Sequence, residues 1–395
     1  MTIPILAPAP RRDLDAGPAG HGWPLLRLGF RPFYLGAAVF AALAVPAWLA
    51  MRSGTLAAPA ALPAFAWHAH EMLFGFAAAV IVGFLFTAGR AWTGQETPRG
   101  WALGLIAALW LAGRVAALVA PPAVWAAIDL ALLPVAAAVL ARVLWKARNR
   151  RNAPLVLLLL ALAGCNLAFH AGWGTWLTPL HGALAVIVAI ECVIAGRVVP
   201  SFTMNATPGL RINAPAWLAR SAVTTTLAGL AGWVLAPANA LTAAVLAAAA
   251  ALHLALARAW RPGVTLQRPI LWILHAGYAC IPLGLALLAA AQLGWLADSP
   301  GVHALAVGAT GGLVIGMLTR TARGHTGRPL VASKLEVTGY GLVLAAAALR
   351  SVLAPLVNPD LALPLAAAAL STAFAFYVWR FGPWLCTPRA DGKDG

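Results

Sequence analysis

Long apolar runs limit what this chain can fold into more than any other feature. A membrane-spanning helix needs about 20 predominantly apolar residues, and twelve segments reach that length between breakers rich in Pro, Gly and Arg. We expect spanning helices near residues 33–51, 68–89, 101–120, 123–144, 154–173, 179–199, 217–236, 239–258, 269–293, 302–320, 336–356 and 361–381. The sequence therefore predicts an all-α, polytopic membrane protein of about twelve helices.

Composition supports the same class of protein. Hydrophobic residues make up 62% of the chain and charged residues 10%, against about 45–50% and about 25% in soluble domains. The formal charge is +16, but the basic residues stand in short loops rather than on one face beside base-reading side chains. This distribution argues against nucleic-acid binding and for a lipid bilayer as the main partner.

The basic residues also predict the orientation of the helices. Lys and Arg near helix ends are retained on the cytoplasmic side, and 24 of the 27 fall in the tails or after even-numbered helices. We therefore expect both termini to be cytoplasmic in an inner membrane. The expected organisation is a cytoplasmic tail over 1–31, one transmembrane domain over 32–382 and a second cytoplasmic tail over 383–395, because no connection is long enough for a soluble domain.

Five histidines share one depth at the outward, periplasmic ends of the predicted helices. They are His68, His70, His170, His181 and His303. A single histidine there is more often an interfacial residue, but neutral imidazole is the commonest metal ligand, and ionisable residues within spans point to function. Together the five predict a metal site near the periplasmic face.

A spacing match links predicted helices 2 and 10. Sliding one onto the other along the sequence superposes three pairs: His70 on His303, Gly75 on Gly308 and Gly83 on Gly316. Helix 6 keeps the pattern from His181 to Arg197, although its glycines do not align. Glycines also recur in any tightly packed membrane helix. If the match reflects a repeat, it implies three pseudo-repeated four-helix arcs with the histidine-bearing helices around a common interior.

His68 and His70 point about 200° apart on a helix and cannot easily bind one metal. They could instead serve two adjacent metals. Glu71 lies one turn after His68, on the same face, where its carboxylate could orient an imidazole from outside the ligand set.

Charged residues inside the apolar spans are further candidates. Arg114 could grip a haem propionate, or it could form an ion pair with Asp129 in the next helix. Glu191 lies near the middle of helix 6, and the sequence leaves open whether it is a protonated buried acid or part of a proton path.

A second polar group is predicted on the cytoplasmic side. It contains Arg320 and His325, in the loop after helix 10, and a binding role would need His325 to turn inward toward His275 in helix 9. Topology signals and turn formation explain the same residues.

Four stretches of the chain resemble the NnrS family of bacterial membrane proteins. They are Phe30-Arg31-Pro32-Phe33, the run WHAHEMLFGF from Trp67, the helix-6 exit with Arg197, Pro200 and Phe202-Thr203, and Arg320 followed by GHTGRPL from Gly324. The resemblance spans nearly the whole chain. It implies a twelve-helix bacterial inner-membrane protein that contains haem b and copper and is associated with nitric oxide metabolism, denitrification and tolerance of nitrosative stress.

The layout is also similar to the catalytic subunit of haem-copper oxidases, in which helices 2, 6 and 10 carry metal-binding histidines. This chain lacks the adjacent His-His pair and the His-Pro-Glu-Val-Tyr stretch of those enzymes, which argues against dioxygen reduction. As a hypothesis, His70 and His303 face each other as haem ligands, with His68, His181 and, as a further candidate, His170 forming the copper site.

The function predicted from these features is binding, sensing or conversion of nitric oxide or a related nitrogen oxide. Electrons for any reaction would come from quinol or a partner protein. Two alternatives remain at this point: a secondary transporter, which twelve helices and a midplane Glu191 would suit, and a non-catalytic partner that holds metal for assembly of another enzyme.

Overall fold

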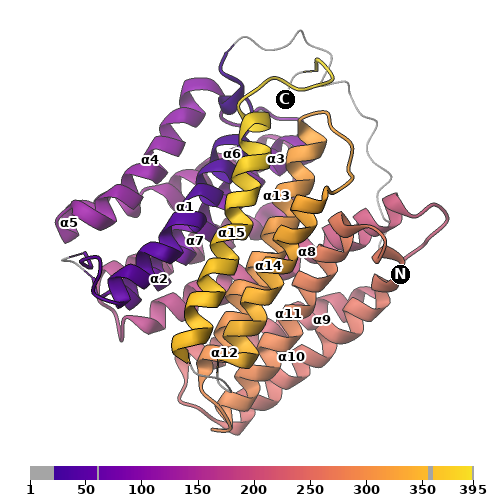
Figure 1. The fold of residues 1–395 in the computed structure, drawn as a ribbon. Coiled ribbons are helices and arrows are strands. Elements are labelled where there is room, and N and C mark those ends of the chain that lie inside the picture. The colour runs from indigo at the N-terminus through magenta and orange to yellow at the C-terminus, as the bar shows by residue number, and fades with distance from the viewer. Residues whose placement is uncertain (1–21, 60–61, 355–358, 394–395) are drawn as a thin grey trace. The chain divides into compact units, whose positions relative to one another are not determined.

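The computed structural model describes residues 22–59, 62–354 and 359–393, and all the regular structure among them is helical (Figure 1). Twelve helices or helix combinations are long and apolar enough to cross a membrane. In chain order they are α1 (Phe30–Arg52), α2 (Ala64–His70) with η2 (Glu71–Ala77) and α3 (Ala78–Thr93), α4 (Gly100–Val119), α5 (Pro122–Asp129) with α6 (Leu132–Lys146), α7 (Ala153–His170), α8 (Leu177–Ala206), α9 (Ala216–Leu235), α10 (Ala240–Ala259), α11 (Pro269–Gln292), α12 (Asp298–His303) with η5 (Ala304–Gly311) and α13 (Gly312–His325), α14 (Lys334–Ala348) with η6 (Leu349–Leu353), and α15 (Pro359–Leu385).

The predicted spans each match one of these twelve, so the chain is a multi-pass, all-helical membrane protein. The separation of helices 3 and 4 at Pro121-Pro122 is confirmed, since α4 ends at Val119 and α5 begins at Pro122. Several helices are longer than predicted; α8, for example, continues to Ala206. The length of an apolar run matches only the part of a helix inside the hydrocarbon core of the bilayer, and the helix itself can continue into the polar interface. The predicted end of helix 11 at 356 and most of the tail 1–31 lie outside the described residues.

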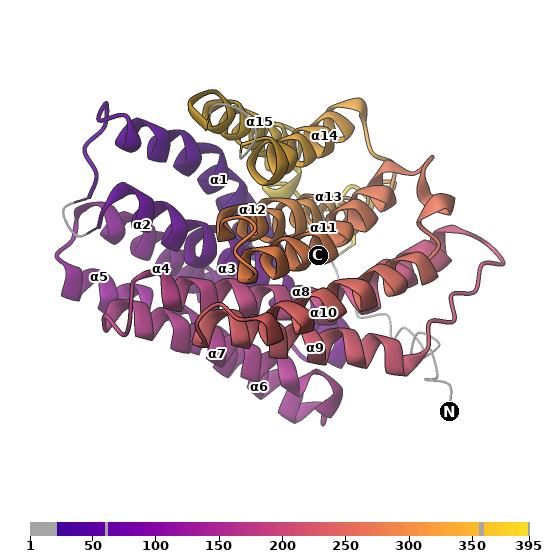
Figure 2. The ribbon, with the colours of Figure 1, turned by 90° about the horizontal axis from the view of Figure 1, so that it is seen from below.

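The described residues form two compact units, which we call unit 1 (within 184–319 and 331–373) and unit 2 (within 22–183, 320–330 and 374–393). In unit 2, α1 packs along α2, η2 and α3, while α4 packs on α5 and α6 on α7. In unit 1, α10 lies between α9 and α11, and η5 packs against α11 and α14 (Figure 2). The single transmembrane domain over 32–382, with its two tails, stays a prediction.

Two π-helical segments begin at corresponding positions of predicted helices 2 and 10. Segment η2 begins directly after His70 and η5 directly after His303, so the same alignment that pairs the histidines also pairs the starts of the π segments. The neighbours of the central glycines also correspond. A Cβ on Gly75 would meet Phe40 of α1 and Arg114 of α4, and one on Gly308 would meet Cys280 of α11 and Ala347 of α14.

The correspondence therefore extends to the helices packed on either side of each π segment. Helix 6 does not share it, because α8 is α-helical from Leu177 to Ala206. The threefold arrangement of arcs stays a prediction.

The fourth span is interrupted after Asp129. Helix α5 ends at this residue, and α6 resumes at Leu132. Pro134 explains the position of the break, because a proline ring clashes with the carbonyl group one turn earlier, here that of Leu130, and cannot donate to it. The interruption places Asp129 at the end of a short helix in unit 2, where its carboxylate meets α4 and α7.

Candidate metal centre

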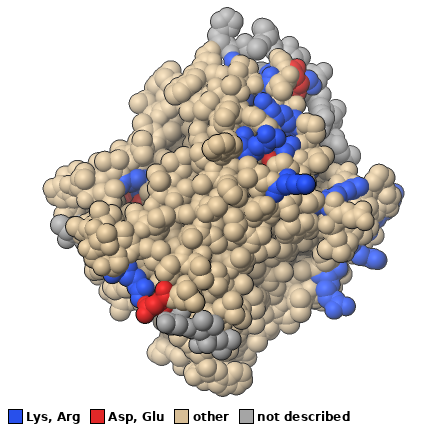
Figure 3. All heavy atoms as spheres, viewed as in Figure 1, with Lys and Arg blue, Asp and Glu red and all other residues tan. Residues whose placement is uncertain are grey.

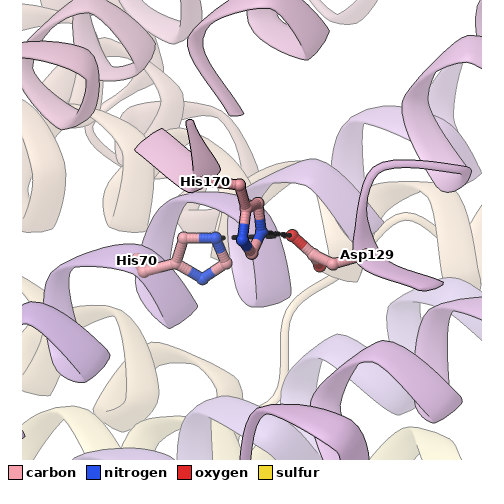
Figure 4. Close-up of side chains that lie close together, drawn as sticks. All are labelled: His70, Asp129 and His170. Carbon is pink, nitrogen blue, oxygen red and sulfur yellow. Dashed lines mark hydrogen bonds and ion pairs between the residues drawn. The ribbon is translucent and has the colours of Figure 1, made fainter. Parts of the chain in front are cut away.

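A buried cluster of polar side chains in unit 2 brings together three of the spans. His70 lies at the end of α2, Asp129 at the end of α5 and His170 at the end of α7, and their side chains converge (Figure 4). The His70 side chain is fully buried, that of Asp129 is 2% exposed and that of His170 is 6% exposed. Such burial of polar groups within an apolar span indicates a functional site.

Asp129 lies at the centre of the cluster. Its Oδ2 lies 3.1 Å from His170 Nε2 and 3.4 Å from His70 Nε2. The same oxygen accepts a hydrogen bond from Asn166 Nδ2 at 2.7 Å. Because the amide nitrogen of Asn166 points to Asp129, its Oδ1 points to His70 Nε2, at 3.0 Å. Asn166 and His170 lie one turn apart on α7 and so share one face.

Arg114 of α4 holds the two carboxylates of the cluster. Its Nη1 donates to Glu71 Oε1 at 2.7 Å, and its Nη2 donates to Asp129 Oδ1. The predicted ion pair between Arg114 and Asp129 is therefore present, and Glu71 makes it a bridge of three side chains. A guanidinium is well suited to this, because its N–H groups form a fixed planar fork.

Glu71 is bonded to His70 rather than to His68. Its Oε1 lies 3.0 Å from His70 Nδ1, although the α-helical spacing had placed Glu71 on the face of His68. The π-helix that begins at Glu71 changes the angle between successive side chains, so the sequence neighbours His70 and Glu71 come into contact. His68 instead stacks on Trp48 of α1, with ring centroids 4.1 Å apart.

Helix η2 and α4 approach each other closely, and Gly75 makes this approach feasible. A Cβ at Gly75 would lie 2.7 Å from Phe40 Cε1 and 3.1 Å from both Arg114 Cδ and Glu71 Oε2. Trp110, one turn before Arg114, donates from its indole nitrogen to the Gly75 carbonyl at 2.9 Å. The π segment and the arginine are thus fixed together.

Aromatic rings enclose the imidazoles. Phe74 and Phe169 lie with ring centroids 4.8 Å from that of His70, and Trp125 lies 4.4 Å from His170. These rings keep water away from the cluster, which strengthens every charge interaction within it.

The net charge of the cluster would be balanced by one further cation. Glu71 and Asp129 carry two negative charges and Arg114 one positive charge, so the net charge is −1 when both imidazoles are neutral. Both nitrogens of His70 face acceptor oxygens, those of Glu71 and Asn166, yet a neutral imidazole has only one N–H. One proton or one metal cation completes the arrangement.

The donor atoms fit a transition metal. One ring nitrogen each of His70 and His170 and one carboxylate oxygen of Asp129 all lie within 4.8 Å of one another. Metal bonds of about 2.0–2.2 Å in a tetrahedral site place ligand atoms about 3.3 Å apart, close to the 3.1 Å and 3.4 Å from Asp129 Oδ2 to the two imidazole nitrogens. Two imidazoles with a carboxylate suit copper, zinc or iron better than magnesium or calcium.

The metal-ligand group of His70, Asp129 and His170 does not include the other predicted histidines. His303, in unit 1, has Nδ1 2.7 Å from the Ser299 carbonyl and Nε2 2.9 Å from Arg350 Nη2. His181 lies in the first turns of α8. His275, also in unit 1, has Nε2 2.9 Å from the Thr203 hydroxyl.

The predicted cytoplasmic group is in unit 2. Arg320 lies in α13 and His325 is its last residue, with the His325 ring 5.5 Å from that of Phe30. The ligand roles of these residues, and of His68 and His181, stay predictions.

Two members of the cluster were not identified as site residues from the sequence. The sequence indicates Asp129 as a buried charge that pairs with Arg114 or faces a polar ligand, and it assigns no role to Asn166. A signal for Asn166 was available, because a polar residue one turn before His170 in an otherwise apolar span shares its face. Nothing local in the sequence indicated that α2, α5 and α7 would meet.

Comparison with known proteins places the chain in a family. No curated protein matches it. The family model described as NnrS protein matches residues 24–389, nearly the whole chain. The chain therefore belongs to the NnrS family, which is linked to the nitric oxide response.

Proposed function

We propose that this protein holds copper and haem b in the bacterial inner membrane, with both termini cytoplasmic, and binds, senses or converts nitric oxide or a related nitrogen oxide near the periplasmic face. The observation that carries the proposal is the buried cluster of His70, Asp129 and His170, whose net charge of −1 and convergent donor atoms suit one metal cation.

The residues around the metal position would have separate roles. His70, Asp129 and His170 would hold copper. Glu71 accepts a hydrogen bond from His70 Nδ1, which directs Nε2 into the cluster and makes the imidazole a stronger ligand. Arg114 prevents both carboxylates from rotating. When bound, copper supplies one-electron exchange and affinity for small nitrogen oxides.

The aromatic wall favours a small uncharged ligand. Phe74, Trp125 and Phe169 surround the imidazoles with apolar surface. A diatomic gas loses little hydration on entering such a place, whereas an ion would lose much. Electrons for any turnover would come from quinol or a protein donor.

Haem requires a ligand outside this cluster. His303 directly precedes the π segment η5, just as His70 directly precedes η2. This correspondence supports the predicted role of His303 as a haem ligand. Both of its ring nitrogens are engaged, however, one with Ser299 and one with Arg350. Ligation by His303 therefore requires Arg350 to leave Nε2. Assigning His70 to copper replaces the expectation that His70 and His303 form a facing haem pair.

The test compares purified wild-type protein with His170→Gln, using absorption spectra of the oxidised and dithionite-reduced protein and counts of iron and copper on the same samples. We expect the variant to hold less copper than wild type while keeping the reduced haem bands. The matched control is His253→Gln, which alters a fully buried imidazole in unit 1 and should keep both metals. Unchanged copper in His170→Gln would reject the assignment.

A further inference from the structure

A second cluster of charged and aromatic side chains lies in unit 2 where α13 and α15 end. Trp384 is in the last turn of α15, and the guanidinium carbons of three arginines lie close to its ring centroid. Arg328 is at 4.2 Å, Arg380 at 4.5 Å and Arg323 at 5.4 Å. We call these four residues the Trp384 arginine cluster.

This cluster lies at the opposite end of the helices from the metal centre. The Phe30 backbone N–H donates to the Thr87 hydroxyl, and Thr87 belongs to the same continuous span as His70. The helical rise between these two residues places their levels about 25 Å apart. The Phe30 ring contacts His325, the last residue of α13. The two sites can therefore be perturbed separately.

Two further arginines fix the framework of the cluster. Arg31 Nη1 donates to the carbonyl groups of Leu385 at 2.8 Å and Thr387 at 2.9 Å. Arg389 Nη1 donates to the carbonyl group of His325 at 3.2 Å. The carbonyl groups at a helix C-terminus lack helical partners and carry partial negative charge. Arg31 and Arg389 thus satisfy the ends of α15 and α13.

The three guanidinium groups around Trp384 repel one another. Arg328 lies in the loop after α13, where partial burial lowers its pKa and the positive charges of Arg380 and Arg323 lower it further. The indole face attracts all three cations and keeps them together in spite of this repulsion. A bound anion would relieve the repulsion, and a guanidinium fork matches the oxygens of a phosphate group.

The position of the cluster indicates the source of that phosphate. Helices α13 and α15 are parts of candidate membrane spans that end here. Trp379, the residue directly before Arg380, is 82% exposed, as is typical of tryptophan at the membrane interface. Figure 3 shows Lys and Arg gathered near the C-terminal end of α15, while most of the face in view carries no charge. Lipid headgroups lie at this depth.

We propose that the Trp384 arginine cluster binds the phosphate of an acidic phospholipid headgroup. Basic pockets between spanning helices are a known means of holding such lipids. Arg328 and Arg380, closest to the indole ring, are the main phosphate contacts, and the buried Arg323 adds a third positive charge. The proposal does not depend on the metal centre.

The test is lipid titration of the detergent-purified full-length protein, followed by native mass spectrometry. Phosphatidylglycerol and phosphatidylcholine are compared on wild type, on Arg328→Gln and on Arg328→Gln with Arg380→Gln. At about 5-fold per arginine, the double variant should bind phosphatidylglycerol about 25-fold more weakly, with phosphatidylcholine unaffected. Arg328→Lys keeps the charge and should retain more affinity than Arg328→Gln.

Control experiments distinguish a specific lipid site from general surface charge and from binding of free phosphate. Arg150→Gln changes an exposed arginine of another loop of unit 2 and should leave phosphatidylglycerol binding unchanged. An equal loss in this control would overturn the proposal in favour of general surface charge. Full displacement of the lipid by millimolar inorganic phosphate would assign the cluster to free anions and would equally overturn it, as would phosphatidylglycerol binding that none of the variants weakens. The thermal unfolding midpoint in detergent serves as an independent check of folding and should be unchanged.

Discussion

Replacing Asp129 with asparagine tests how the metal centre is held together. Asp129 accepts from Arg114 through Oδ1 and from Asn166 through Oδ2. Asparagine has the same shape but only one acceptor oxygen, so one of these donors would face an NH2 group. The change also removes the negative charge that would attract a metal cation.

The magnitude follows from these contacts. The lost hydrogen bond to a charged group is worth about 1.5–3 kcal/mol. The buried charge of Arg114 also loses one of its two carboxylate partners, so the metal-free variant should lose about 3–5 kcal/mol of stability in total, in the range for breaking a buried ion pair. Wild type should also gain about 2.7 kcal/mol from copper at 100 times its dissociation constant. Asp129→Asn should gain almost none of this.

The assay is thermal and denaturant unfolding in detergent, with and without copper. The control is Glu96→Gln, because Glu96 is 63% exposed and pairs with Arg90 and Arg99 at the surface. Exposed pairs are worth about 1 kcal/mol or less, so this control should keep its copper-induced stabilisation. If Asp129→Asn gains as much stability from copper as wild type, Asp129 is not a ligand and the reasoning is wrong.

Three other substitutions probe how the centre is positioned. Gly75→Ala places a Cβ 2.7 Å from Phe40 Cε1 and should lower copper content and thermal stability, whereas Gly164→Ala, with nothing within 4 Å, should change neither. Trp110→Phe removes the hydrogen bond to the Gly75 carbonyl and should cost about 1 kcal/mol in the unfolding assay. Pro134→Ala lets α5 and α6 join into one helix and should reduce copper affinity by moving Asp129; an unchanged copper titration would show that the break does not position this carboxylate.

The spans were predictable because their cause is local. Each helix must satisfy its own backbone within the bilayer, so a run of about 20 apolar residues is enough to identify it. The match between helices 2 and 10 was also readable, since the glycines that follow His70 align with those that follow His303. The π segments that follow both histidines could not be predicted, because no residue pattern distinguishes a π-helix from an α-helix at these positions.

The composition of the site was only partly predictable. The predicted depth in the membrane grouped His70 and His170 with three other histidines, but this depth carries no information on which helices are in contact. The contact between α5 and α7 depends on side-chain packing over the length of both spans. Asp129 therefore changed from an ion-pair partner to a proposed ligand only once Asn166 and His170 were found beside it.

The matched π segments bear on the transporter alternative. Alternating-access transporters often place their sites at unwound, discontinuous helices. The spans over 64–93 and 298–325, both fully described, stay helical through η2 and η5. These two matched spans are therefore unbroken, and the interruption between α5 and α6 lies in a different span.

The most direct test of the central claim is copper K-edge absorption spectroscopy of the copper-loaded, full-length protein. The account predicts a nearest shell of nitrogen and oxygen at about 2.0 Å, with outer-shell scattering from two imidazoles that falls to one in His170→Gln. A sulfur shell at about 2.3 Å, or imidazole scattering unchanged by that substitution, would contradict the assignment of His70, Asp129 and His170 as the metal centre.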